Sequence, residues 1–236
     1  MKQYYRVADL VIEMDSFGHT VIQAIPYEIE GKHTPDIVIK TDWQSLKESQ
    51  PHLSEEDCEY LSTGSSFYRQ LVEFDGLMLH SSAVVMDGRA YLFSAPCGTG
   101  KSTHTALWRS VFGEDRAFIL NDDKPAIRLE NGEFFAYGTP WSGKTDQNVN
   151  MRVPIGGICV LRRGETNKIE PCGGSAAVFA ILEQTARSKA PEFMNKLMDL
   201  IVLLVEKVPV WRMECKMDPE AAIMSYTAMS GVGKEK

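Results

Sequence analysis

A glycine-rich segment that ends in lysine and serine is the part of this sequence best suited to chemistry. An apolar run, Tyr91–Phe93, leads into the segment Cys97–Thr103, which reads CGTGKST, and helix-favouring residues follow at once. Glycine at positions 98 and 100 lets backbone N–H groups turn toward an anion, and the N-terminus of the following helix adds its own free N–H groups. The segment therefore predicts a phosphate-binding P-loop.

Each residue type in this loop has an expected contact with a nucleotide. Lys101 would reach the β- and γ-phosphates, and the Ser102 hydroxyl would bind Mg²⁺. Cys97 suits either a redox role or a small residue that fills the loop. Ala95 stands where the usual pattern G-x-x-x-x-G-K-[ST] has its first glycine, and it limits the backbone there. The expected nucleotide-binding residues are Cys97, Gly98, Thr99, Gly100, Lys101, Ser102 and Thr103.

Two adjacent carboxylates follow the next predicted strand. The apolar run Ala117–Leu120 ends in Asn121, Asp122, Asp123 and Lys124. At a strand end after a P-loop helix, one carboxylate would hold Mg²⁺ and the other would take a proton from a hydroxyl nucleophile. An Asp-rich turn is the purely structural alternative. The position relative to the P-loop favours a functional pair.

A predicted hairpin places a histidine beside the P-loop. The strand-like runs Leu79–Met86 and Arg89–Ser94 flank Asp87-Gly88, a strong signal for a two-residue turn. Because Met86 then faces Arg89, His80 should face Ala95. The imidazole could act at the mouth of the loop, or it could be a strand-end histidine satisfied by the backbone. Both readings stay open.

A further loop carries a second lysine that could contact a phosphate. The segment Tyr137–Lys144 is rich in Gly, Pro and Ser and contains one Trp. Such a loop can fold over a bound nucleotide, with Lys144 near a phosphate. A plain surface connection explains the same composition equally well.

The elements around these residues predict an α/β fold. Before residue 50, the apolar runs Leu10–Met14, Val21–Ile25 and Ile37–Ile39 predict strands, the first two joined by a polar turn. Ser54 suits the N-cap of a helix. We expect a small β-rich N-terminal unit over residues 1–75 and a nucleotide-binding domain over residues 76–236. The later expected elements are a helix over Ser102–Phe112 with Leu107 and Val111 facing the sheet, a turn at Asn131-Gly132, strands over Ile155–Leu161 and Val208–Met213, and helices over Ala176–Arg187, Phe193–Val205 and Pro219–Met229.

The composition limits the partners. The chain has 236 residues, 44% of them hydrophobic, and a formal net charge of −7, which argues against a general nucleic-acid surface. Its longest strongly apolar run, Leu200–Val205, is too short to span a bilayer, and its first residues lack a signal-peptide pattern. We therefore expect a cytoplasmic protein that binds no membrane, with homo-oligomer formation left open. The five cysteines show no C-x-x-C spacing, which predicts reduced thiols and no zinc site.

The order of these motifs resembles the C-terminal catalytic domain of HPr kinase/phosphorylase, and more distantly the nucleotide core of ATP-dependent phosphoenolpyruvate carboxykinase. The resemblance covers about residues 77 to 165. It implies a mixed sheet around the P-loop, and ATP and Mg²⁺ as cofactors. It also implies Asp122 as general base, His80 and Lys101 as catalytic partners, and Ser102 and Asp123 as magnesium ligands. Lys124 stands where the kinase has an arginine, and the kinase's downstream Glu-containing signature has no clear equivalent.

The resemblance implies an ATP-dependent kinase that phosphorylates a hydroxyl group of a small molecule, peptide or protein. The alternative is a non-catalytic nucleotide-binding module that regulates or scaffolds a partner. A carboxykinase is disfavoured because the sequence offers no clear set of arginines for a carboxylate substrate.

Overall fold

The predicted hairpin lies within the larger of two sheets. In the computed structural model, which describes residues 3–187 and 190–231, strands β5 (Ser81–Met86) and β6 (Arg89–Ser94) pair antiparallel. Met86 lies opposite Arg89 and Ser81 opposite Ser94, which confirms the predicted turn and register. Strand β7 (Ala117–Asp123) pairs with the other edge of β5. Strand β5 therefore lies between β7, which carries the two carboxylates, and β6, which leads into the P-loop.

The larger sheet has nine strands and is mixed, as the resemblance implies. Its long strand β10 (Arg152–Arg163) runs parallel to β6 and to β12 (Val210–Cys215) but antiparallel to β9 (Glu133–Tyr137). The remaining strands are β4 (Gly76–Met78), β8 (Ala126–Glu130) and β11 (Lys168–Pro171). The predicted turn at Asn131-Gly132 joins β8 to β9.

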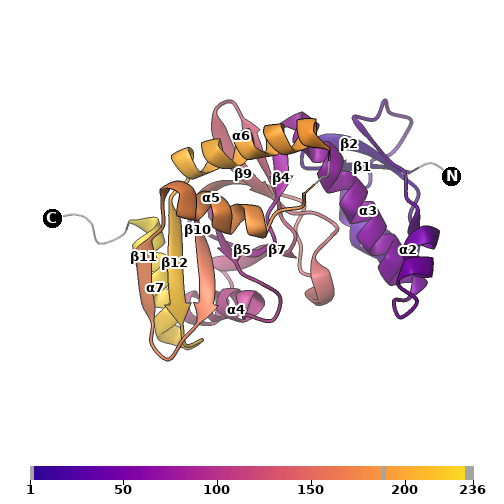
Figure 1. Cartoon of the computed structure of the whole chain (residues 1–236). Helices are drawn as coiled ribbons and strands as arrows, with labels where there is room; N and C mark the ends of the chain where they lie inside the picture. The colour runs from indigo at the N-terminus through magenta and orange to yellow at the C-terminus, as the bar shows by residue number, and fades with distance from the viewer. Residues whose placement is uncertain (1–2, 188–189, 232–236) are drawn as a thin grey trace.

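Alternating side chains on β5 send apolar groups to both faces of this sheet. Ala83 and Val85 join one core cluster with helices α5 (Gly174–Glu183) and α6 (Pro191–Lys207). Val84 and Met86 join another with α4 (Lys101–Phe112) and α7 (Pro219–Ser230). Figure 1 shows α5 and α6 on one side of the strands and α4 on the other. Burial on both faces explains why the second half of this strand, residues 83–86, is apolar without alternation.

The buried face of α4 differs from the expected one. Leu107 and Val111 are only partly buried, whereas His104 and Trp108 have no exposed surface. The Ser225 hydroxyl on α7 explains this difference, because it lies 2.9 Å from Nε1 of Trp108 and 3.0 Å from Nε2 of His104. A partner more than a hundred residues away thus satisfies one ring nitrogen of each buried side chain.

The N-terminal unit contains a three-stranded sheet, as expected, but one predicted strand is wrong. Strand β2 (Leu10–Met14) pairs with β1 (Gln3–Val7), which the sequence reading missed, and with β3 (Ile37–Ile39). The run Val21–Ile25 falls mostly in helix α1 (Gly18–Ala24), with Ile22 and Ile25 exposed. Contacts of α1 with a neighbouring helix override the strand propensity of its β-branched residues. The other helical segments here are α2 (Trp43–Ser49) and the 3₁₀ turns η1 (Ile25–Tyr27) and η2 (Val72–Phe74).

Helix α3 (Glu55–Leu71) joins this unit to the larger sheet. Ser54 caps it, and its side chain and that of Asp57 form a reciprocal capping box. Tyr68 shares a core cluster with Tyr137 and Trp141 from the larger unit. The boundary at residue 75 stays a prediction. No helix among the described residues is both long and apolar enough to cross a membrane.

Candidate functional site

The P-loop has the backbone geometry of an anion cradle. Gly98 and Gly100 have φ angles of 76° and 119°, which other residues rarely adopt. A Cβ atom at Gly100 would also lie 2.6 Å from the Met217 side chain. Helix α4 begins directly after Gly100 without a side-chain cap, so its first N–H groups remain available to an anion.

The alanine in place of the first glycine fits this loop. Ala95 is fully buried and does not have a positive φ angle, so its Cβ atom causes no backbone strain. Its carbonyl oxygen accepts a hydrogen bond from Nζ of Lys101 at 2.9 Å. The Ala95 backbone thus helps to hold the lysine in the loop.

Lys101 and His80 meet at the loop, as the hairpin register predicts. Nε2 of His80 lies 3.1 Å from Nζ of Lys101 and 3.0 Å from Oδ1 of Asp123. Burial lowers the pKa of the Lys101 ammonium, and the charge of Asp123 opposes that effect. The other ring nitrogen of His80 lies 3.2 Å from the Gln184 side-chain oxygen. One ring nitrogen of His80 therefore faces both Lys101 and Asp123, and the other faces Gln184.

Asp122 is buried and accepts hydrogen bonds from two hydroxyl groups. It is 4% exposed. The Ser102 hydroxyl donates to Oδ1 at 2.9 Å, and the Thr145 hydroxyl donates to Oδ2 at 2.8 Å. Within residues 3–187 and 190–231, Asp122 forms no ion pair. A buried carboxyl group thus lies beside the P-loop serine, in position to bind a cation together with it.

Asp123 has a different environment, with His80 on one side and Lys124 on the other. His80 and Lys124 contact its two carboxylate oxygens. Burial would raise the pKa of Asp123, but the hydrogen bonds and charges of His80 and Lys124 outweigh burial and hold that pKa well below its usual range. Its φ angle of 110° is a strained conformation of the kind found at functional sites.

These groups open into one cavity of about 980 Å³. One wall is the P-loop with Cys97 and Thr103, and another comes from the first turns of α3. Lys144 also lines it, next to the short 3₁₀ turn η3 (Gly143–Thr145). The structure therefore brings every sequence-predicted site residue into or beside a single cavity, apart from Thr99, whose carbonyl accepts a hydrogen bond from Arg163 on β10.

Sequence reasoning missed several groups at this site. Thr145 reaches Asp122, Tyr60 of α3 accepts a hydrogen bond from the N–H of Gly143 at 2.8 Å, and Arg163 donates to the carbonyl of Gly98 at 2.6 Å. The basic pair at the end of β10 was a signal for Arg163. No local pattern marks Thr145 or Tyr60, because their contacts depend on the tertiary fold.

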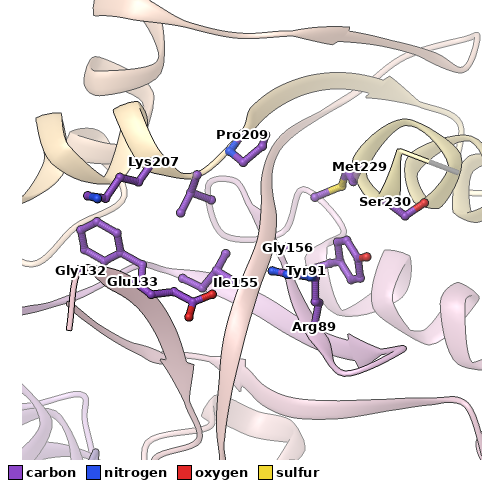
Figure 2. A pocket seen from close by; sticks show the side chains of 12 residues that line it. Arg89, Tyr91, Gly132, Glu133, Ile155, Gly156, Lys207, Pro209, Met229 and Ser230 are labelled. Atoms are coloured by element: carbon purple, nitrogen blue, oxygen red, sulfur yellow. The ribbon is translucent and has the colours of Figure 1, made fainter. Parts of the chain in front are cut away.

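A second cavity lies far from this chemistry. It has a volume of about 400 Å³ and contains Arg89, Tyr91, Glu133 and Lys207 (Figure 2). Arg89 begins β6, whereas the P-loop follows the opposite end of that strand. No P-loop residue and neither strand-end carboxylate lines it. The larger cavity is therefore the candidate active site.

Comparison with known proteins adds a family. The family model described as SynChlorMet cassette protein ScmC matches residues 53–220. The chain belongs to the ScmC family. The ScmC match spans the P-loop, the two carboxylates and the segment that carries Thr145, and it starts just before the N-cap of α3.

The other comparisons add little to the ScmC assignment. The search of curated proteins found no match. A solved structure of the Hpr(Ser) kinase/phosphatase from Coxiella burnetii is similar, with 13% sequence identity and a TM-score of 0.37, over 64% of this chain and 96% of that chain.

Proposed function

We propose that this ScmC-family protein is an ATP-dependent kinase that transfers the γ-phosphoryl group of ATP to a hydroxyl group. The observation that carries the proposal is the pair Ser102–Asp122. A buried carboxylate without an ion pair among the described residues lies in hydrogen-bond contact with the P-loop serine. P-loop enzymes use a serine or threonine and a strand-end Asp in this relation to hold Mg²⁺.

The oxygen donors present fit Mg²⁺. The Ser102 hydroxyl and the Asp122 carboxylate are hard ligands, and Mg²⁺ often binds through one or two carboxylates plus substrate phosphates. The described residues contain no larger His, Cys, Asp and Glu cluster, which agrees with a site that phosphates complete. The ion would neutralise charge on the β- and γ-phosphates.

Asp123 suits the acceptor side better than the metal side. In the proposed reaction the acceptor oxygen attacks the γ-phosphorus, the bond from phosphorus to the bridging oxygen breaks, and ADP leaves. Asp123 accepts the acceptor's proton, and Lys101 and Lys124 stabilise the charge on the transferring group. Phosphoryl transfer passes through a loose transition state, so a carboxylate with a low pKa can orient the hydroxyl without removing its proton early. This assignment exchanges the roles that the resemblance implies for Asp122 and Asp123.

Calorimetric titration with ATP, with and without Mg²⁺, tests the nucleotide site. We expect Mg²⁺-dependent binding by the wild type and its loss in Lys101→Ala. Incubation with small hydroxyl compounds, serine peptides and proteins, followed by detection of ADP, then tests transfer. Absence of binding in the wild type would refute the proposal. Binding without turnover on any acceptor would support the non-catalytic regulatory module instead.

A further inference from the structure

The segment from Gly143 to Gln147 connects the N-terminal unit to the candidate metal site. At its start, the N–H of Gly143 donates to the Tyr60 hydroxyl on α3 at 2.8 Å. Near its end, Asp146 lies 2.7 Å from Nε2 of His19 on α1. The Gln147 carbonyl accepts the backbone N–H of Asp122 at 2.9 Å. Two helices of the N-terminal unit and the end of β7 therefore hold this segment.

Thr145 lies between these attachment points and contacts the metal-side carboxylate. Its hydroxyl donates a hydrogen bond to Oδ2 of Asp122, and the Ser102 hydroxyl donates one to Oδ1. Each carboxylate oxygen thus receives one hydrogen bond, which fixes rotation of the carboxylate plane. A carboxylate that is held by partners outside the metal's own ligands binds a metal in a fixed orientation.

We infer that Thr145 is a positioning residue that orients Asp122 toward a divalent cation, and that the N-terminal unit holds Thr145 in place through Tyr60 and His19. The inference rests on the proposed nucleotide site. The His19–Asp146 pair is about 40% exposed and adds little stability by itself. The contact of Gly143 with Tyr60 is part-buried and is the stronger of the two attachments.

The test is a Mg²⁺ titration at fixed ATP by calorimetry. Thr145→Val keeps the side-chain shape and removes the hydroxyl, and Thr145→Ser restores the hydroxyl. We expect Thr145→Val to need about tenfold more Mg²⁺ for half-maximal ATP binding, as is typical when a partner of a metal ligand is removed. Thr145→Ser should need an amount within about twofold of the wild type, on the same scale. Weak ATP binding without Mg²⁺ should not change.

The matched control is Thr227→Val, because among the described residues that exposed hydroxyl bonds only a carbonyl of its own helix. Should Thr145→Val fail to fold, Tyr60→Phe tests the same link, since it removes the attachment of Gly143 and keeps the ring. The Tyr60 hydroxyl also bonds Lys124, so ATP binding without Mg²⁺ is measured beside it and should not change. Equal Mg²⁺ dependence in wild type and folded Thr145→Val would overturn the inference and leave the nucleotide site intact. A wild type without any Mg²⁺-dependent binding would overturn both.

Discussion

Nε2 of His80 lies 3.0 Å from Oδ1 of Asp123, so a histidine just before one strand contacts a carboxylate at the end of another. The same nitrogen lies 3.1 Å from Nζ of Lys101. His80 therefore connects the lysine of the P-loop to the carboxylate that faces the cavity. A change at His80 should alter Asp123 without removing a phosphate contact.

Replacing His80 by Gln should weaken the fold more near neutral pH than in acid. The depressed pKa of Asp123 means that its partners stabilise the folded state above the carboxylate's unfolded pKa, and this stability is lost as the pH falls. We expect His80→Gln to lower the free energy of unfolding by about 1–2 kcal/mol at pH 7, with a smaller difference at pH 3. Urea unfolding at both pH values measures this. His33→Gln, an exposed histidine that contacts a nearby backbone carbonyl, is the control. An equal loss at both pH values would contradict the prediction.

The two carboxylates should respond differently to amide substitution. Asp123→Asn should retain Mg²⁺-dependent ATP binding but reduce phosphoryl transfer by about 10²-fold or more, the usual size of a general-base contribution. Asp122→Asn should lose the Mg²⁺ dependence of binding, because the amide cannot supply the buried negative charge. Calorimetry and ADP release distinguish the two. The reverse pattern would return the base to Asp122 and the metal to Asp123, as the resemblance implies.

The position of His80 could be predicted because its determinants are local. Asp87-Gly88 fixes the turn, side chains alternate with a period of two, and the register then sets His80 opposite Ala95. The capping of α3 by Ser54 was equally local. These elements show that sequence patterns are sufficient where neighbouring residues determine the conformation.

The parts that sequence reasoning missed depend on distant partners. The run Val21–Ile25 has strand propensity, yet the Thr20 hydroxyl bonds to Glu59 of α3 and the run becomes helical. Thr145 resembles any loop threonine until the fold brings Asp122 to it from 23 positions earlier in the sequence. The spacing of apolar residues does not predict such contacts, because each depends on how separate elements pack.

Exchanging glycine and alanine at two P-loop positions, 95 and 100, should show where the loop requires glycine. Gly100→Ala places a Cβ atom at a φ angle of 119° and against Met217, so it should destabilise the protein by about 1–3 kcal/mol and impair ATP binding. Ala95→Gly relieves no strain and should cost about 0.5–1 kcal/mol through greater freedom of the unfolded chain, with ATP binding unchanged. Thermal unfolding and calorimetry test both. Stronger ATP binding in Ala95→Gly would mean that the alanine does hinder the loop.

Glu59 should make the stability of the N-terminal unit depend on pH. This α3 carboxyl is 1% exposed, and its Oε1 atom has no hydrogen-bond partner among the described residues, whereas its Oε2 atom accepts the Thr20 hydroxyl of α1. Burial raises the pKa of Glu59 to about 7, against the opposing effects of hydrogen bonds from the Thr20 side chain and the Phe17 backbone. Because the folded-state pKa is raised, the contribution of Glu59 to stability is largest below its unfolded pKa and is lost as the pH rises toward 7.

Replacing Glu59 by Gln should therefore remove this dependence. A shift of this size corresponds to about 3 kcal/mol between the two limits, so wild type should lose that much free energy of unfolding from pH 4.5 to pH 8 relative to Glu59→Gln. The variant should be the more stable protein at pH 8, since an amide is buried at lower cost than a carboxylate. Urea unfolding across this range, with the exposed Glu55→Gln as control, measures the difference. Parallel pH curves for wild type and Glu59→Gln would show that Glu59 is ionised in the folded state throughout the range.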